Sequence, residues 1–356
     1  MRVYCGMRVA VLCDTHFGAR NDSPIFLHYF FKFLDDVFFP YLEKEGITEI
    51  LHLGDLMDRR KFVNFATLHE TRERFIQRLI QKSIRATILL GNHDTYFRNT
   101  SSINSVEELF GNMEDQGIKI IRDPQEITVG GTKLLLLPWI NRSNEEKSRQ
   151  LIETTTASIV MGHLELTGYE VLRGTRFTEG MDPTPFKRFE AVYSGHFHCK
   201  HSRENVHYLG TPYQITFGDL NEPKGFHVFD TEDRSMQYVE NPLRIFDEIV
   251  YDDSTTDYTK NMPNMNRFKE TFVRVRVTRK KNPSMFDMFM DTINSCGAHG
   301  VTVLEDKGSD TEISSTVDVS KDTLSLINHE IDSLEVTNPV KLKSIIRDLY
   351  MESLFI

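Results

Sequence analysis

Five short polar motifs in the first 200 residues each directly follow an apolar segment that reads as a strand. They are Asp14-Thr15-His16, Gly54-Asp55, Gly91-Asn92-His93-Asp94, Gly162-His163 and Gly195-His196-Phe197-His198. Alone, each motif is more often a capped turn or a hydrogen-bonded histidine than a functional group. Together they restrict the fold, because polar residues at the carboxyl ends of parallel strands meet at one edge of a sheet.

The segments between these motifs predict an α/β fold. Apolar strands are predicted over Met7–Cys13, Ile47–Leu53 and Thr87–Leu90, with amphipathic helices over Pro24–Lys44 and Phe62–Lys82 between them. This βαβαβ order predicts a largely parallel sheet. Short strands then dominate up to Val239, which predicts a second sheet packed on the first. Their predicted ranges are Leu134–Leu137, Ser158–Gly162, Ala191–Gly195, Val206–Leu209, Phe226–Phe229 and Met236–Val239.

The pattern changes after Pro242, where we place a domain boundary. A strand (Phe272–Val277), a helix (Met285–Cys296) and a strand (Val301–Leu304) predict a small α/β module over residues 243–315. Two helices, Thr323–Ile331 and Lys341–Phe355, are predicted within residues 316–356. Periodicity does not decide whether these helices dock on a partner or pack on their own domain.

The residue types of the five motifs suit a centre for two cations. Carboxylate, amide and imidazole groups together favour a first-row transition ion; we expect Mn²⁺, with Mg²⁺, Fe²⁺ or Zn²⁺ as alternatives. A carboxylate such as Asp55 can bridge two cations about 4 Å apart. In the alternative interpretation the glycines are ordinary turn formers, which leaves the histidines unexplained. The candidate ligands are Asp14, His16, Asp55, Asn92, His163, His196 and His198.

His93 stands between candidate ligands and has a different expected role. It can point at the substrate and stabilise or protonate the departing oxygen. Asp58 and Asp94 are the candidates to orient it. The glycines before the ligands have a steric explanation, since a chain that turns sharply off a strand beneath a metal has little room for a Cβ atom.

Composition restricts the compartment and argues against one class of partner. The net charge of −10 does not favour long-range attraction to nucleic acid, although bound cations would cancel part of it and local basic patches can bind phosphates. No uninterrupted run of about 18 apolar residues predicts a membrane span. Met1–Gly6 has no signal-peptide core, so we expect a cytoplasmic protein. The cysteines, Cys5, Cys13, Cys199 and Cys296, predict neither a disulfide framework nor a zinc ribbon.

The motifs D-x-H, G-D-x-x-D, G-N-H-D, G-H and G-H-x-H resemble those of the calcineurin-like metallophosphoesterase superfamily. The stretches Gly54–Lys61 and Leu209–Asp219, with Lys224-Gly225 after them, are similar to the SbcD branch of recombination nucleases, and the size and C-terminus resemble bacteriophage members. The resemblance implies the metallophosphoesterase fold, two packed mixed β-sheets flanked by helices. It also implies that the module after residue 242 is a capping domain that engages duplex DNA.

The resemblance also implies residue roles and partners. It assigns one metal to Asp14, His16, Asp55 and His198, and the other to Asp55, Asn92, His163 and His196. His93 takes the transition-state role. The position of Asp58 is aspartate in some branches and histidine in others, which leaves its partnership with His93 open. The implied partners are DNA and an SbcC-type coiled-coil ATPase docked through the C-terminal helices, with a homodimer inside a heterotetramer. The implied location is the host cytoplasm if the chain is of phage origin, and Met7 is a possible functional start.

The predicted function is therefore a Mn²⁺-dependent DNA nuclease, an exonuclease or endonuclease of recombination and repair. Two alternatives remain: a small-molecule phosphatase or phosphodiesterase of the same superfamily, and a DNA-end-binding scaffold with a vestigial metal site. Two basic runs can contact phosphates, although such runs are usually solvated turns. They are Arg59-Arg60-Lys61 and Arg279-Lys280-Lys281, while Tyr96, Phe97 and Arg98 can touch a frayed base or simply pack.

Overall fold

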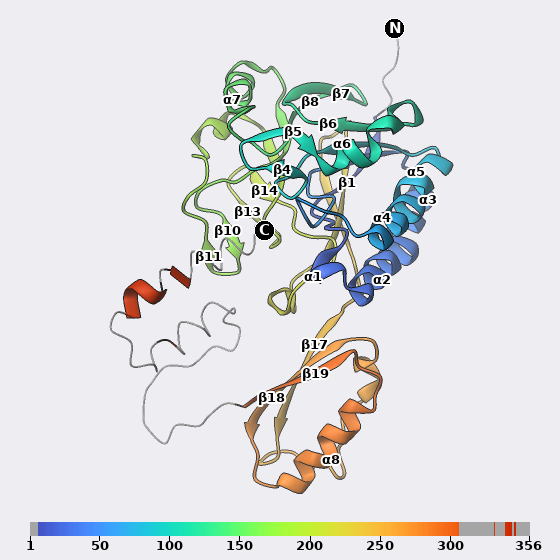
Figure 1. Cartoon of the computed structure of the whole chain (residues 1–356), viewed down its shortest axis with the longest axis vertical. Coiled ribbons are helices and arrows are strands. Elements are labelled where there is room, and N and C mark those ends of the chain that lie inside the picture. Colours follow the sequence, from blue (N-terminus) through green and yellow to red (C-terminus); the bar gives the residue numbers. More distant parts are fainter. Residues whose placement is uncertain (1–5, 306–330, 332–338, 344, 347–356) are drawn as a thin grey trace. The chain divides into compact units, whose positions relative to one another are not determined.

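The computed structural model describes residues 6–305, 331, 339–343, 345 and 346. These residues form two compact units (Figure 1). Unit 1 contains residues 6–215 and 222–242, together with the described residues beyond 330. Unit 2 contains residues 216–221 and 243–305.

The first sheet of unit 1 has the strand order β16-β15-β1-β2-β3-β6. Its parallel strands are β1 (Arg8–Leu12), β2 (Glu49–His52), β3 (Arg85–Leu89) and β6 (Ile118–Ile121). β15 (Gly225–Asp230) and β16 (Met236–Glu240) extend the sheet in antiparallel fashion beside β1. The predicted parallel arrangement of the first three strands is confirmed. The strands predicted at Phe226–Phe229 and Met236–Val239 were expected in the second sheet, but as β15 and β16 they belong to the first, because β15 pairs with β1.

The second sheet of unit 1 has the strand order β13-β14-β12-β9-β8-β7. It consists of β7 (Gln125–Val129), β8 (Thr132–Leu137), β9 (Ile159–His163), β12 (Ala191–Gly195), β13 (His201–Arg203) and β14 (Val206–Tyr208). The four strands from β8 to β14 in this order are parallel, and β7 and β13 are antiparallel edges. Val11 and Leu53 pack in one core with Leu136 and Met161. The predicted packing of two mixed sheets is confirmed.

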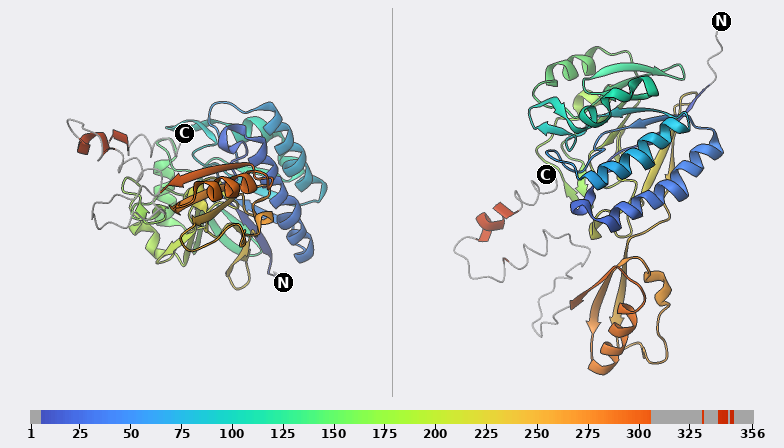
Figure 2. Two further views of the ribbon diagram at one scale, coloured as in Figure 1. Left: turned by 90° about the horizontal axis from the view of Figure 1, so that it is seen from below. Right: turned by 45° about the vertical axis from the view of Figure 1, so that its right-hand side comes forward.

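Helices cover the outer face of each sheet (Figure 2). The first crossover runs through the short turn α1 (Ala19–Asp22), α2 (Pro24–Phe33), the π-helical η1 (Leu34–Phe38) and α3 (Phe39–Glu45). Phe38 contacts Phe226 of β15 with ring centroids 4.9 Å apart. On the second sheet, Ile152 of α7 (Glu145–Thr154) shares a core with Leu135 and Val160. The buried side chains of both sheets are thereby shielded on two faces.

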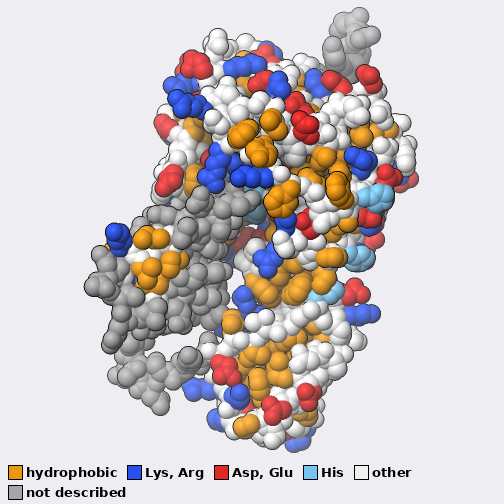
Figure 3. All heavy atoms as spheres, in the orientation of Figure 1, with side chains coloured by type: hydrophobic (Ala, Val, Ile, Leu, Met, Phe, Trp, Pro, Cys, Tyr) orange, Lys and Arg blue, Asp and Glu red, His pale blue; other side chains and the backbone are white. Residues whose placement is uncertain are grey.

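The second crossover helix begins later than the sequence suggested. It consists of α4 (Phe65–Thr71), the π-helical η2 (Arg72–Ile76) and α5 (Gln77–Gln81). Asn64 caps its start, since its Oδ1 accepts a hydrogen bond from the backbone N–H of Ala66 at 2.8 Å. Phe62 and Phe65 are therefore left 62% and 86% exposed. Figure 3 shows that hydrophobic side chains also reach the surface of unit 1 among Lys and Arg side chains.

Shorter elements complete unit 1. They are the hairpin β4 (Thr95–Phe97) and β5 (Thr100–Asn104), α6 (Ser105–Phe110), η3 (Gly111–Gln116), β10 (Glu170–Leu172), β11 (Thr175–Arg176) and η4 (Thr184–Arg188). Among the residues that the structure describes, no helix is both long enough and apolar enough to cross a membrane. Residues 339–343, 345 and 346 are helical, inside or next to the predicted helix Lys341–Phe355. The rest of that helix, and all of Thr323–Ile331 except Ile331, lie outside the described residues.

Unit 2 is a three-stranded parallel sheet with one long helix. The order is β17 (Phe246–Asp252), β18 (Phe272–Arg279) and β19 (Gly300–Glu305), and the helix is α8 (Pro283–Asn294). Val273, Val275 and Val277 alternate along β18 and pack in one core with Phe289 of α8. The predicted strand, helix and strand are confirmed, and β17 was not predicted. η5 (Phe217–Asp219) and η6 (Met265–Phe268) also belong to this unit.

Candidate metal centre

All five polar motifs lie at the carboxyl ends of parallel strands in unit 1. Asp14 follows β1, Asp55 follows β2 and Asn92 follows β3 in the first sheet, while His163 ends β9 and His196 follows β12 in the second. The two sheets pack face to face, so their carboxyl ends bring these side chains to a common site. The seven candidate ligands are buried, except His198, which is partly exposed.

The ligand atoms form two groups with Asp55 at their border, and a ring nitrogen of His93 also lies within 4.8 Å of the ligand atoms of His16 and Asp55. In the first group, Nε2 of His16 lies 3.0 Å from Nε2 of His198, and a carboxylate oxygen of Asp14 lies within 4.8 Å of a ring nitrogen of each. Nε2 of His16 is also 3.7 Å from Oδ2 of Asp55. Asp55 therefore stands at the edge of this group.

The second group is centred on the amide oxygen of Asn92. This Oδ1 lies 2.9 Å from Nε2 of His163 and 2.9 Å from Nδ1 of His196. Nε2 of His163 is 3.4 Å from the same Oδ2 of Asp55. Nδ1 of His163 lies 2.8 Å from the carbonyl oxygen of Leu53, an arrangement that turns Nε2 towards the site. The carboxylate of Asp55 thus borders both groups.

This arrangement fits divalent cations. The carboxylates, the amide oxygen and the ring nitrogens point at common positions, and two imidazole nitrogens face each other directly in the first group. Burial would lower the pKa of His16, but its contacts with Asp58 and Asp55 outweigh burial and raise the pKa to about 9. Burial would also lower the pKa of His163, but its contact with Asp55 outweighs burial and raises the pKa to about 9. The buried carboxylates therefore attract positive charge to the site.

Four of the candidate ligands have a left-handed backbone conformation. The φ angles are 51° at Asp14, 43° at His16, 55° at Asp55 and 88° at His196. Hydrogen bonds between the motifs hold this geometry: the N–H of His16 donates to the carbonyl of Asp55 at 3.1 Å, and the N–H of His196 donates to Oδ1 of Asp14 at 2.9 Å. Such a backbone costs free energy, so its recurrence at these positions indicates that the loops are built to aim the side chains.

Two glycines keep the space between the loops open. A Cβ atom on Gly91 would lie 2.7 Å from Cγ of Asp55, and closer still to its Oδ1 and backbone N. A Cβ atom on Gly54 would lie 2.5 Å from Nδ1 of His163, and the φ of Gly54 is +94°. The predicted steric reason for glycine is confirmed at both positions.

The surroundings of His93 differ from the expectation for both candidate orienting residues, Asp58 and Asp94. Its Nδ1 lies 2.6 Å from the backbone carbonyl oxygen of Asp58, whereas the carboxylate of Asp58 lies 3.3 Å from Nδ1 of His16. The carboxylate of Asp94 accepts hydrogen bonds from the backbone N–H groups of Gly91 at 2.8 Å and Met57 at 3.0 Å. Asp94 therefore joins the loops after β2 and β3, and the backbone of Asp58, rather than its carboxylate, contacts the ring of His93.

Three supporting residues were not singled out for these contacts from the sequence. Lys224, 3% exposed, donates from Nζ to the carbonyl of His198 at 2.9 Å and to Oγ1 of Thr211 at 2.8 Å. The indole N–H of Trp139 donates to Oε1 of Glu165 at 2.8 Å, and that oxygen lies 3.5 Å from Nε2 of His196. Trp139 and Glu165 also follow strands of the second sheet, but their residue types do not mark a metal site.

Comparisons with known proteins place the chain among phosphoesterases and nuclease subunits. Residues 7–200 match the family model described as calcineurin-like phosphoesterase. Exonuclease subunit 1 of Enterobacteria phage T4 is 29% identical over 326 residues, which cover 91% of this chain and 91% of the relative. The SbcD subunit of the SbcCD nuclease of Staphylococcus epidermidis is 26% identical over 260 residues, covering 65% of this chain and 67% of the relative.

Solved structures give weaker likenesses. A novel archaeal phosphodiesterase shares 14% identity with a TM-score of 0.34, and a hypothetical protein from Thermus thermophilus shares 15% identity with a TM-score of 0.34. Each likeness covers 66% of this chain and 100% of the chain of the solved structure. Scores this low carry no argument about the fold.

Proposed function

The chain belongs to the calcineurin-like phosphoesterase family, and on this premise we propose that it is a metal-dependent nuclease that hydrolyses the phosphodiester bonds of DNA. One observation carries the hydrolytic part of the proposal: seven side chains of ligand type converge from five strand ends into two groups that share Asp55. A shared carboxylate between two groups of ligands is the arrangement that two-metal hydrolases use.

The family binds divalent cations, and the proposed assignment follows the two groups of atoms. Asp14, His16, Asp55 and His198 would hold one ion, and Asp55, Asn92, His163 and His196 the other. Mn²⁺ is the proposed ion, because oxygen ligands balance the imidazoles; Mg²⁺, Fe²⁺ and Zn²⁺ are the alternatives. When bound, the two ions would stabilise negative charge on the phosphoryl oxygens and lower the pKa of the attacking water.

His93 is the proposed proton donor to the departing oxygen. The carbonyl of Asp58 occupies its Nδ1, so Nε2 is the ring nitrogen that we assign to the substrate. Burial lowers the pKa of His93, and the negative charge of an arriving phosphate would favour the protonated ring again. The backbone N–H of His93 donates to Oδ1 of Asp55 at 2.8 Å, which fixes the position of the ring relative to the shared carboxylate.

The extent of the similarity supports DNA as the substrate. The likeness to the T4 exonuclease subunit covers 91% of the chain and so extends beyond the catalytic unit. An enzyme for small phosphoesters has little use for a separate α/β module. We therefore assign residues 1–242 to catalysis and 243–315 to a capping domain that engages DNA. Residues 316–356 would dock an SbcC-type coiled-coil ATPase in a heterotetramer that contains a homodimer of this chain, located in the cytoplasm.

The test is cleavage of linear duplex and single-stranded DNA by the purified chain with Mn²⁺, beside bis(4-nitrophenyl) phosphate. Asp55→Asn is the control for the metal centre, with bound metal measured by elemental analysis. We expect DNA cleavage in the wild type and loss of both metal and cleavage in Asp55→Asn. Hydrolysis of the aryl diester without DNA cleavage, also with the ATPase partner present, would replace the proposal by a small-molecule phosphodiesterase. Stoichiometric DNA binding without either reaction would indicate a scaffold.

A further inference from the structure

The three basic residues after the second motif have different surroundings. Arg59 has partners within the protein: its Nη1 lies 3.2 Å from Oδ2 of Asp22, and its Nη2 donates a hydrogen bond to Oδ1 of Asn21. Lys61 is exposed to solvent. Arg60 is partly buried, and its Nε and Nη1 atoms are buried with no hydrogen-bond partner in the part of the chain that the structure describes. The sequence gives no reason to separate these residues, but the structure singles out Arg60.

A chain of contacts links Arg60 to the metal centre. Its guanidinium lies over the ring of Trp139, 5.3 Å from the ring centroid. The indole of Trp139 donates to Glu165, and the same carboxylate oxygen of Glu165 lies 3.5 Å from Nε2 of His196. Trp139 is only 8% exposed, so packing holds its ring in place beneath the guanidinium. Trp139 and Glu165 also line a cleft of about 430 Å³, and Arg60 does not belong to its lining.

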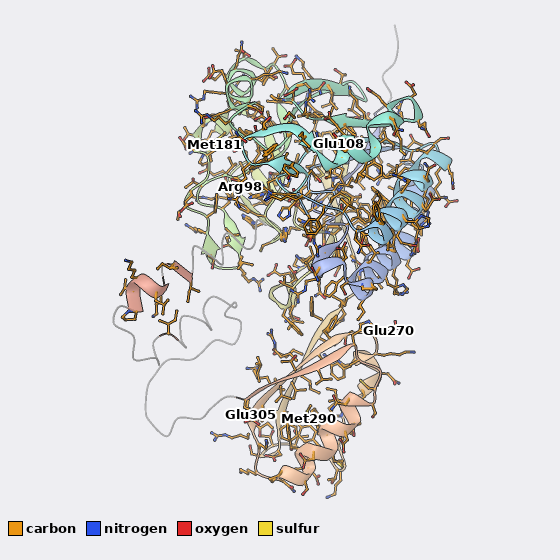
Figure 4. All side chains as sticks on the ribbon, in the orientation of Figure 1. Arg98, Glu108, Met181, Glu270, Met290 and Glu305 are labelled. Carbon is orange, nitrogen blue, oxygen red and sulfur yellow. The ribbon has the colours of Figure 1, made fainter. Side chains whose placement is uncertain are left out.

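A guanidinium in this position is costly without an anion. Removing charged donors from water without a partner destabilises the protein, and no ion pair of Arg60 is found among the described residues. Two carboxylates of the site have other partners: that of Asp94 accepts backbone hydrogen bonds, and that of Asp55 borders both ligand groups. Burial, followed by the charge of Arg98, lowers the pKa of Arg60. Arg98, labelled in Figure 4, lies in the turn between β4 and β5.

The chemistry of the group identifies the class of anion. A planar guanidinium presents parallel N–H donors that match two oxygens of a phosphate, and stacking on an aromatic ring fixes its plane. The reacting phosphate itself belongs at the ligand groups around Asp55. A polynucleotide offers a second phosphate beside the reacting one, whereas a simple phosphodiester does not.

We propose that Arg60 binds a non-reacting backbone phosphate of the nucleic acid, next to the phosphate that is hydrolysed. This inference rests on the proposed nuclease function and deepens it, because it gives one side chain the task of favouring a polynucleotide over a small diester. Trp139 is the positioning residue for Arg60, and Glu165 holds Trp139 in turn.

The first test compares Arg60→Met and Arg60→Lys with the wild type on two substrates. Arg60→Met should lower kcat/KM for a single-stranded oligonucleotide by about 10- to 100-fold, the loss expected for a charged hydrogen bond. It should leave the Mn²⁺-dependent hydrolysis of bis(4-nitrophenyl) phosphate within about twofold, because that ester has no second phosphate. Arg60→Lys keeps the charge but loses the bidentate geometry, so an intermediate loss is expected. Lys61→Met removes the same charge one residue away and is the matched control, with cleavage close to that of the wild type.

The second test neutralises single phosphates in the substrate. A set of oligonucleotides carries one methylphosphonate each, at successive linkages from a defined cleavage site. In the wild type, one neutral linkage near that site should reduce cleavage by about the same factor as Arg60→Met. In Arg60→Met, the same neutral linkage should have no further effect, because the contact is already absent.

The outcomes separate this inference from the proposed function. Equal losses on both substrates would make Arg60 a support of the metal centre and overturn its role as a phosphate ligand. Unchanged cleavage in Arg60→Met, equal losses in Lys61→Met, or additive effects of the variant and the neutral linkage would each overturn it as well. If the wild type hydrolyses the aryl diester and leaves DNA intact, the nuclease proposal itself fails, and the binding of a second phosphate fails with it.

Discussion

Replacing Gly91 by alanine tests how the loops of the metal centre depend on each other. The new Cβ atom would lie 2.7 Å from Cγ of Asp55 and closer still to the backbone N of that residue. A side chain could rotate away, but the backbone of Asp55 has a φ of 55°, and its carbonyl accepts a hydrogen bond from His16. The loop as a whole must therefore move.

The expected magnitude follows from forcing one methyl group into a packed interior. Overpacking of this kind lowers the free energy of unfolding by about 1–3 kcal/mol, and a clash with backbone atoms places Gly91→Ala at about 3 kcal/mol. The displaced carboxylate should also weaken Mn²⁺ binding by about 10- to 100-fold. Urea denaturation of the metal-free protein measures the first effect, and calorimetric titration with Mn²⁺ measures the second.

Gly111→Ala is the matched control for this prediction. Gly111 has a φ of −61°, and the nearest atom to an added Cβ would be Cβ of Glu107 at 3.7 Å, an ordinary contact. This variant should keep both the stability and the metal affinity of the wild type. If Gly91→Ala behaves in the same way, the close approach of the two loops does not hold Asp55 in place, and the reasoning is refuted.

Three further variants test other parts of the site and the core. His93→Asn should keep both metals but lower kcat by about 100- to 10,000-fold, as measured by elemental analysis and DNA cleavage; turnover like that of the wild type would refute its role. Lys224→Met removes the donors to His198 and Thr211 and should lower the free energy of unfolding by about 1–3 kcal/mol in urea denaturation. Burial lowers the pKa of His227 to about 3, so between its unfolded value of about 6.5 and pH 3 the unfolded chain takes up a proton that the folded chain does not, and stability falls as the pH falls. From pH 7.5 to pH 5.5, urea denaturation should show the wild type losing about 1 kcal/mol more than His227→Gln, and equal losses would contradict this.

The placement of the motifs could be predicted from the sequence because two simple signals coincide. Apolar strands are visible as buried runs, and polar residues directly after them must lie at the ends of those strands. β1 and β12 were therefore located to within two residues at each end. Asn92 and His163 could be predicted to lie at a common site because each stands at the carboxyl end of a strand. This prediction did not require the register between neighbouring strands.

Other features depend on contacts between distant parts of the chain. Asp94 follows His93 in the sequence, which suggested an orienting role, but its carboxylate bonds to the backbone of the neighbouring loop. β17 was not predicted because it contains the charged residue Asp247. Only the structure shows that Nη2 of Arg267 lies 2.5 Å from Oδ1 of Asp247 and forms an ion pair with it. The joining of β15 to the first sheet depends on its register with β1, which no local pattern contains.

The left-handed backbone at Asp14, His16, Asp55 and His196 has a consequence for which amino acids these positions can accept. Asp, Asn and His are the side chains that tolerate this conformation best after glycine, and they are also ligands for hard and borderline cations. The left-handed backbone conformation and the coordination of a cation therefore favour the same few residue types, each for a separate reason. A valine scan across these positions would report backbone cost and lost coordination together, whereas exchanges among Asp, Asn and His would report coordination alone.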